Sequence, residues 1–164
     1  MTKIIVLCLS VLTLLAALTG IPASAALAQD RGPVNISSDR LEADDQAHIL
    51  VFSGNAVAVQ GDVTVHGDRL TVKYSGEQRE IQQVTAEGNV RIVQGTRVAT
   101  GDKATLYQAD ERIVLTGSPK VIDGDNSVRG EEITIFLNDK RSVVTGGTGG
   151  RVNAVFTPKG EAQP

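Results

Sequence analysis

The sequence predicts an all-β protein, a jelly roll of stacked, repeated hairpins that is open at both ends like a solenoid. Three observations lead to this prediction. Apolar and polar residues alternate in short runs, glycines separate these runs, and one short pattern recurs along the chain. After residue 33, no run shows the three- and four-residue apolar spacing of an amphipathic helix.

The first 28 residues have the pattern of a secretory signal peptide. Lys3 provides a basic start, the stretch 4–21 is almost wholly apolar, and Pro22 ends it. Two small-residue triplets follow, 23–25 and 26–28, and both fit the A-x-A rule for cleavage. We therefore expect cleavage after Ala25 or Ala28 and export from the cytoplasm. Because the apolar stretch is also long enough to span a bilayer, an uncleaved membrane anchor is the alternative.

Residues 29–159 are expected to form one domain, and residues 160–164 a flexible tail. A chain of this length can bury a core without disulfides. The only cysteine, Cys8, lies in the signal segment, so the domain has no disulfide and no thiolate metal site. The formal net charge is −3 and no basic run occurs, which argues against nucleic-acid binding.

An internal repeat organises the expected hairpins. Its first element begins at Ser38, Gly67, Gly101 and Gly130, and each copy continues with an acidic residue and then alternating apolar residues. A second element interleaves with the first at 53–61 and 87–95, more loosely at 116–124, and in a degenerate copy from residue 146. Repeats of this kind stack one on the next to bury a shared core.

The apolar positions change face at the glycines of the first element. Val65 and Leu70 are an odd number of residues apart, so a regular strand would place them on opposite faces. A bend or bulge at Gly67 would return both to one face, and we expect the same at Gly101 and Gly130. The recurring acids Asp39, Asp68, Asp102 and Glu131 are expected to have a structural role at these bends.

The aligned repeats predict which side chains line the interior. Apolar residues recur in the same columns, whereas the positions between them are polar and should face water: Arg69, Lys103, Glu132, Thr71, Thr105 and Thr134. The predicted interior residues are Phe52, Ala58, Leu70, Val72, Ile92, Leu106, Leu115, Val121, Ile133 and Ile135.

The first and last strands, near 34–37 and 151–157, should be unpaired edges of the sheet. Such edges invite strand addition by another copy or by a partner protein. The residues predicted to take part are Val34, Asn35, Ile36, Val152, Ala154 and Phe156.

We find no pattern of a catalytic, metal or cofactor site. The only histidines, His48 and His66, have no second histidine at metal-ligand spacing, and His66, just before a bend glycine, is expected to lie exposed in a turn. Asp44 and Asp45 are expected to form a solvated turn. The glycine-rich segment 146–150 is followed by neither a Lys-Ser/Thr pair nor a helix, so we interpret it as a flexible link rather than a phosphate loop.

An ordered series of segments resembles one family. The series runs through Val34–Glu42, Phe52–Val57, Ala86–Val90, Ala99–Ala104 and Leu115–Pro119, and it closes at Arg151–Lys159. Taken together, the mature chain resembles the OstA-like lipopolysaccharide-transport proteins. No single segment is specific, because glycine–asparagine turns are common, but the series covers nearly the whole domain.

The resemblance implies a periplasmic carrier that is not an enzyme. Its cargo would be lipopolysaccharide, with the acyl chains of lipid A in the interior of the jelly roll, and it would bridge the inner and outer membranes. The implied partners are an LptC-like protein anchored in the inner membrane, an LptD-like subunit of the outer-membrane translocon, and further copies stacked head to tail.

Two alternatives remain from the sequence. The first is a structural β-solenoid that self-associates through its open ends without lipid cargo, which the repeat and the edges fit equally well. The second is a sugar-cleaving enzyme of the β-helix type, which would need a cluster of carboxylates on one exposed face.

Overall fold

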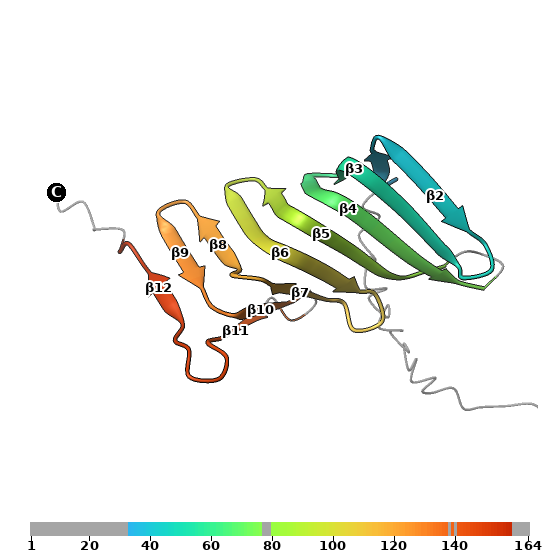
Figure 1. Ribbon diagram of the computed structural model, residues 1–164. Helices are drawn as coiled ribbons and strands as arrows, with labels where there is room; N and C mark the ends of the chain where they lie inside the picture. The colour runs from blue at the N-terminus through green and yellow to red at the C-terminus, as the bar shows by residue number, and fades with distance from the viewer. Residues whose placement is uncertain (1–32, 77–79, 138, 140, 159–164) are drawn as a thin grey trace, which may run out of the picture. The chain divides into compact units, whose positions relative to one another are not determined.

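The computed structural model describes residues 33–158 except 77–79, 138 and 140 (Figure 1). The predicted all-β class is confirmed: the described residues contain strands and no helix. The predicted signal peptide 1–28 and tail 160–164 lie outside the described residues and stay predictions. Within the described part, no helix is long and apolar enough to cross a membrane.

One 12-stranded antiparallel sheet contains every strand. Its main path runs β1-β3-β4-β5-β6-β7-β10-β11, while β2 pairs with β3, β8 with β6 and β9, and β12 with β9. The strands are β1 Asn35–Ser37, β2 Arg40–Asp44, β3 Ile49–Gln60, β4 Val63–Ser75, β5 Glu80–Gln94, β6 Arg97–Tyr107, β7 Arg112–Thr116, β8 Lys120–Asp123, β9 Asn126–Arg129, β10 Glu132–Phe136, β11 Arg141–Thr145 and β12 Asn153–Val155.

The sheet is bent into two halves that face each other. The long strands β3 to β6 run through both halves, whereas the shorter strands belong to one half each (Figure 1). We call them the β9 half, which contains β1, β8, β9 and β12, and the β10 half, which contains β2, β7, β10 and β11. Strand β6 shows the division clearly, because Arg97–Thr100 pair with β8 and Lys103–Tyr107 pair with β7.

The bends lie at irregularities of the strand register. The pairing shifts between Ser53 and Ala56 in β3, between His66 and Arg69 in β4, and between Glu87 and Val90 in β5. These shifts confirm the predicted bulge at Gly67. The unusual backbone, however, belongs to the second element of the repeat, where Gly88 and Asn89 have positive φ angles of 74° and 48°. Glycine and asparagine are the residues that tolerate this left-handed conformation.

An acidic residue on the neighbouring segment forms a hydrogen bond at each of three bends. The carboxylate of Asp39 accepts a hydrogen bond from Asn55 Nδ2 at 3.3 Å, and that of Asp68 accepts one from Asn89 Nδ2 at 2.9 Å. The third copy uses the backbone, since the Asp102 N–H donates to the carbonyl of Gly117 at 3.1 Å. These contacts confirm the structural role predicted for the recurring acids.

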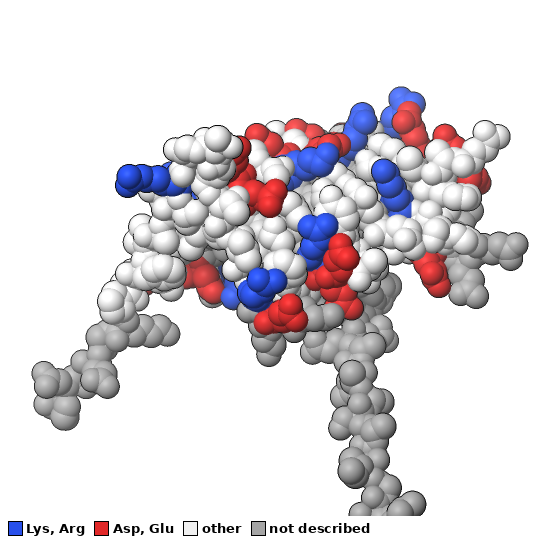
Figure 2. Space-filling model, turned by 90° about the horizontal axis from the view of Figure 1, so that it is seen from below, with Lys and Arg blue, Asp and Glu red and all other residues white. Residues whose placement is uncertain are grey.

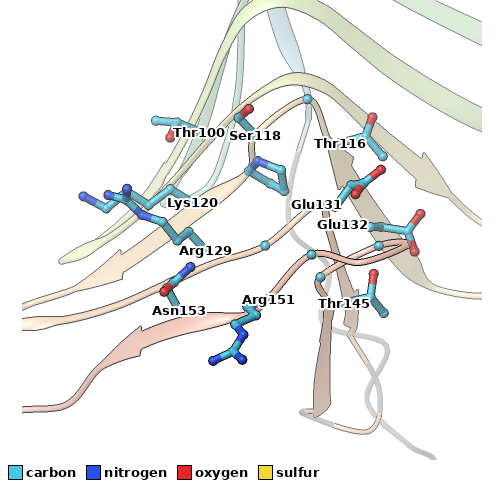
Figure 3. Close-up of a pocket in the computed structure, with 16 residues that line it drawn as sticks. Thr100, Thr116, Ser118, Lys120, Arg129, Glu131, Glu132, Thr145, Arg151 and Asn153 are labelled. Atoms are coloured by element: carbon cyan, nitrogen blue, oxygen red, sulfur yellow. The ribbon is translucent and has the colours of Figure 1, made fainter.

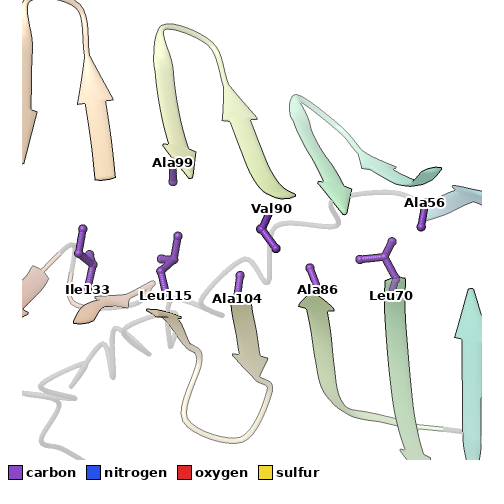
Figure 4. Close-up of a cluster of buried hydrophobic side chains, with 8 residues drawn as sticks. All are labelled: Ala56, Leu70, Ala86, Val90, Ala99, Ala104, Leu115 and Ile133. Carbon is purple, nitrogen blue, oxygen red and sulfur yellow. The ribbon is translucent and has the colours of Figure 1, made fainter. Parts of the chain in front are cut away.

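Apolar side chains from the two halves meet between them (Figure 4). Leu70, Leu115 and Ile133 project from the β10 half and are at most 1% exposed. The small residues opposite them let the halves approach closely. The fully buried cluster consists of Ala56, Leu70, Ala86, Val90, Ala99, Ala104, Leu115 and Ile133.

The prediction that the intervening threonines face water is wrong for two of them. Thr105 and Thr134 are only 5% and 9% exposed, although they lie on the outer face. Each is a short side chain between two long ones on the same face of its strand: Lys103 and Tyr107 flank Thr105, as Glu132 and Phe136 flank Thr134. Arg69 and Lys103 are exposed as predicted, while Thr71 and Glu132 are half-buried.

Candidate functional site

The inner face of the β9 half carries a continuous apolar row. Residues directly opposite each other in register form this row, so it crosses the half without interruption. Its members are Ile36, Ala58, Val65, Ile92, Ala99, Val121, Val128 and Ala154.

The inner face of the β10 half carries two such rows. The one nearer the bend consists of Leu41, Phe52, Leu70, Ala86, Ala104, Leu115, Ile133 and Val144. The one farther from it consists of Ala43, Leu50, Val72, Val84, Leu106, Ile113 and Ile135.

Burial of the inner side chains differs along and between the rows. Leu115 near the bend is completely buried, whereas Leu106 and Ile135 in the farther row are half-buried. In the facing β9 half, Ile92 and Val121 are half-buried as well. The two halves therefore share a closed apolar core at the bend, and several apolar side chains of the inner face outside this core are only half-buried.

Every predicted interior residue lies in one of these three rows. Phe52, Leu70, Leu115 and Ile133 lie near the bend, Val72, Leu106 and Ile135 lie farther out, and Ala58, Ile92 and Val121 lie in the β9 half. Their placement on the inner face is a structural fact, while their contact with lipid stays a prediction. The predicted interior set leaves out Ile113 and Val128, although each alternates with a polar neighbour and has a register partner among the predicted residues.

A polar rim borders the β9 half where its strands turn. Arg97 and Asp123 are register partners there, and the guanidinium lies 3.1 Å from the carboxylate. Thr96 Oγ1 also donates a hydrogen bond to Asp123 Oδ1 at 3.0 Å. The hydrogen bonds from Thr96 and then Arg97 hold the pKa of Asp123 below its ordinary value of 3.8. Polar groups thus mark the end of the apolar surface.

Charged side chains of both signs lie on the outside of the molecule. Figure 2 shows Lys and Arg beside Asp and Glu on the face seen from below. Lys103 and Glu87 form one of these pairs, with 2.9 Å between Nζ and Oε1. Exposed pairs of this kind contribute little to stability, and their arrangement contrasts with the apolar interior.

The structure supplies no clustered metal ligands: among the described residues, no group of three His, Cys, Asp or Glu side chains could hold an ion. His48 lies exposed in the β2–β3 turn, with its ring 5.4 Å from that of Tyr74. The prediction for His66 is wrong, because this residue is half-buried within β4, opposite Arg91. Strand β4 runs through His66 without a turn and bends at Gly67.

Both ends of the sheet have unpaired strand edges. Among the strands that the structure describes, β1 pairs only with β3 and β12 only with β9, so the predicted edge strands are edges of the described sheet. Val34, Val152 and Phe156 are exposed by 45%, 43% and 71%, and Asn35 and Ala154 are exposed too. Ile36 is different, since it points inward and packs against the core.

Each end also has a second edge, in the β10 half, that the sequence analysis missed. Strand β2 pairs only with β3, and β11 pairs only with β10. Leu41 on β2 is 56% exposed and Val143 on β11 is 38% exposed. Both halves of the jelly roll are therefore open at both ends.

The chain is similar to known proteins both in sequence and in fold. Residues 35–141 match the family described as LptA/(LptD N-terminal domain) LPS transport protein. An uncharacterized protein of Rhizobium meliloti (strain 1021) is 29% identical over 90 residues, which are 51% of this chain and 48% of that protein. The lipopolysaccharide export system protein LptA of Escherichia coli (strain K12) is 28% identical over 68 residues, 42% of this chain and 37% of LptA.

These matches span less than half of either relative's length. Among solved structures, the chain resembles the crystal structure of LptH from Pseudomonas aeruginosa, described as the LptA homologous periplasmic component of the conserved lipopolysaccharide transport device. The TM-score is 0.69 at 24% identity, over 79% of this chain and 99% of that chain. This likeness confirms the jelly-roll fold.

Proposed function

Because the chain belongs to the LptA/(LptD N-terminal domain) family of LPS transport proteins, we propose that it binds lipopolysaccharide and carries it between the inner and outer membranes. Membership also confirms the resemblance to OstA-like proteins. The acyl chains of lipid A would lie against the half-buried apolar rows between the two halves. The function is binding and transfer, so it needs no catalytic group.

The observation that carries this proposal is the continuity of the inner rows. Each methylene of an acyl chain costs about 0.8 kcal/mol when it is exposed to water, so a carrier must offer apolar surface along the whole path. Adjacent strands lie about 4.8 Å apart, and a row that crosses every strand of a half provides such a path. Leu106, Ile113 and Ile135 are neighbours on that path.

We place the protein in the periplasm. The pattern of a cleavable signal peptide at residues 1–28 supports this location. The likeness to LptH supports it too, since LptH is described as a periplasmic component. An uncleaved anchor would leave the domain in the same compartment.

The four unpaired edges are the proposed contact surfaces for partners. An LptC-like protein at the inner membrane and an LptD-like subunit at the outer membrane would each add strands to one end. A second copy could add to either end, because head-to-tail contact uses the same edges. Strand addition would continue the inner rows from one protein into the next.

The test is photocrosslinking in living cells with a photoreactive residue at one of two neighbouring positions. Leu106 and Tyr107 are adjacent in β6 and both half-buried, but Leu106 faces the interior and Tyr107 faces outward. A lipopolysaccharide adduct at Leu106 alone supports the proposal. Equal adducts at both positions, or none in an exported and folded protein, contradict it.

A second candidate is a structural, self-associating β-solenoid without lipid cargo. The exposed apolar side chains at the edges, such as Phe156, favour it as much as they favour a bridge. The same experiment separates the two candidates, since a solenoid of this kind would form protein–protein adducts at its edges and no lipid adduct at Leu106.

A further inference from the structure

A pocket of about 1090 Å³ lies on the outer side of the bend, away from the apolar rows (Figure 3). Lys120 and Arg129 line it from the β9 half, while their strand neighbours Val121 and Val128 belong to the inner row. Because adjacent strand residues point to opposite faces, the pocket opens outward and is separate from the proposed lipid path. Its volume is slightly above the range of about 300–1,000 Å³ that is typical of small-ligand sites.

One wall of the pocket is cationic. Lys120 and Arg129 are direct register partners, and Arg151 approaches from the segment before β12. In the described part of the chain, none of the three forms an ion pair. Like charges directly opposite each other destabilise a sheet, so this pair is not explained by the stability of the strands. A bound anion would offset the repulsion.

The opposite wall is acidic. Glu131 and Glu132 lie across the pocket from Lys120 and Arg129 (Figure 3). Glu131 packs against Gly147, and the Glu132 carboxylate accepts a hydrogen bond from Thr134 Oγ1 at 3.3 Å. A carboxylate has capacity for several hydrogen bonds, so both residues can still accept from a ligand.

The glycine-rich segment 146–150 forms the remaining side. Gly146, Gly147 and Gly150 line the pocket, and φ is positive at Gly147 and Gly149, at 65° and 79°. Glycines leave the backbone open to close approach by a ligand. The sequence predicts a flexible link here, whereas in the structure the segment is part of a built surface.

We propose that this outer pocket, lined by Lys120 and Arg129 on one side and by Glu131 and Glu132 on the other, binds a phosphorylated sugar. The phosphate would lie against the two cations, which form charge-assisted hydrogen bonds with phosphate oxygens. The sugar hydroxyls would donate to the two glutamates. A simple anion would form no hydrogen bonds with Glu131 and Glu132, and its negative charge would lie near theirs. A ligand that has hydroxyl groups as well as a phosphate therefore fits better.

The test is calorimetric titration of the purified protein with glucose 6-phosphate. We expect K120Q/R129Q to raise its Kd at least about ten-fold. R91Q is the matched control, because Arg91 is also exposed on the outer face of the β9 half but does not line the pocket. Equal affinity in the wild type and the double variant would overturn the proposal, as would equal binding of unphosphorylated glucose or of inorganic phosphate.

Two further experiments address a variant that fails to fold and the source of the ligand. If the double variant fails to fold, R151Q gives the same test, since Arg151 lies outside every strand. Competition by the deacylated, phosphorylated oligosaccharide of lipopolysaccharide would assign the site to a glycolipid headgroup, and its failure to compete would assign it to a free sugar phosphate. None of these probes has acyl chains, so the outcome is independent of lipid binding between the halves.

Discussion

Asn89 donates a hydrogen bond to Asp68 across the bend, with 2.9 Å between Nδ2 and Oδ2. Asn89 belongs to the second element of the repeat and to β5, whereas Asp68 belongs to the first element and to β4. Beside this bond, the left-handed Gly88 lies so close to Asp68 that a Cβ added to the glycine would be 2.8 Å from the aspartate Cβ. The contact therefore needs a glycine for two reasons, its backbone conformation and the space.

Replacing Gly88 with alanine separates these two reasons. A left-handed conformation costs an ordinary residue about 1–2 kcal/mol. Gly95 also has a positive φ, 56°, but a Cβ there would meet nothing within 4 Å. We expect Gly88→Ala to lower the free energy of unfolding by at least about 1 kcal/mol more than Gly95→Ala does, measured by urea denaturation. Equal losses would show that the carboxylate moves aside without cost.

Truncation of the closed core should be costly. Leu115 is completely buried, so Leu115→Ala is expected to lower the free energy of unfolding by about 2–5 kcal/mol. Leu41 is 56% exposed at the β2 edge, and Leu41→Ala should cost less than about 1 kcal/mol. Denaturation of both variants measures the difference. A similar cost for the two would contradict the assignment of Leu115 to the core.

A charge on the inner face should impair lipid transfer. Leu106→Asp places a carboxylate among apolar side chains, which an acyl chain would have to cover. Val98→Asp is the matched control, because Val98 is also a half-buried apolar residue of β6 but faces outward. We expect Leu106→Asp to reduce lipopolysaccharide transfer to an acceptor protein several-fold, with Val98→Asp close to the wild type. The reverse order would show that the lipid uses the outer face.

Asp123 should contribute stability that acid removes. Its pKa is lowered in the folded state, so its contribution is present above pH 3.8 and is lost as pH falls through the lowered value. The side chain is 47% exposed, so the effect on stability is small. Titration by NMR should place the pKa of Asp123 below 3.8, and Thr96→Val should raise it. An unchanged pKa in that variant would mean that Arg97 alone lowers it.

The strand edges should govern self-association. Phe156→Lys places a charge at the β12 end, where 71% of the phenylalanine is exposed, and should weaken association measured by sedimentation. Ile81→Lys is the control, since Ile81 is 41% exposed but belongs to β5, a strand paired on both sides. Equal behaviour of the two variants would remove the edges from the proposal.

The periodicity of the sequence predicted the inner face correctly because register and alternation are local properties. Residue type did not predict depth, however. Thr105 is polar and on the outer face, yet it is only 5% exposed, and no column of the repeat contains that information. The edges at β2 and β11 were not predicted either, because the columns of the repeat do not contain the pairing of these strands. Whether β2 and β11 gain partners depends on how the long strands divide at the bend.

Two successive bends have an Asp–Asn contact, between Asp39 and Asn55 and between Asp68 and Asn89, so the hairpins behave as similar modules. A hairpin with its own Asp–Asn contact and its own inner residues carries everything needed to join the stack. Duplication or loss of one hairpin would lengthen or shorten the apolar path by about 10 Å, two strand spacings, and leave both terminal edges unchanged. Gene-level gain or loss of single modules could therefore adjust the span of such a protein without redesigning its ends.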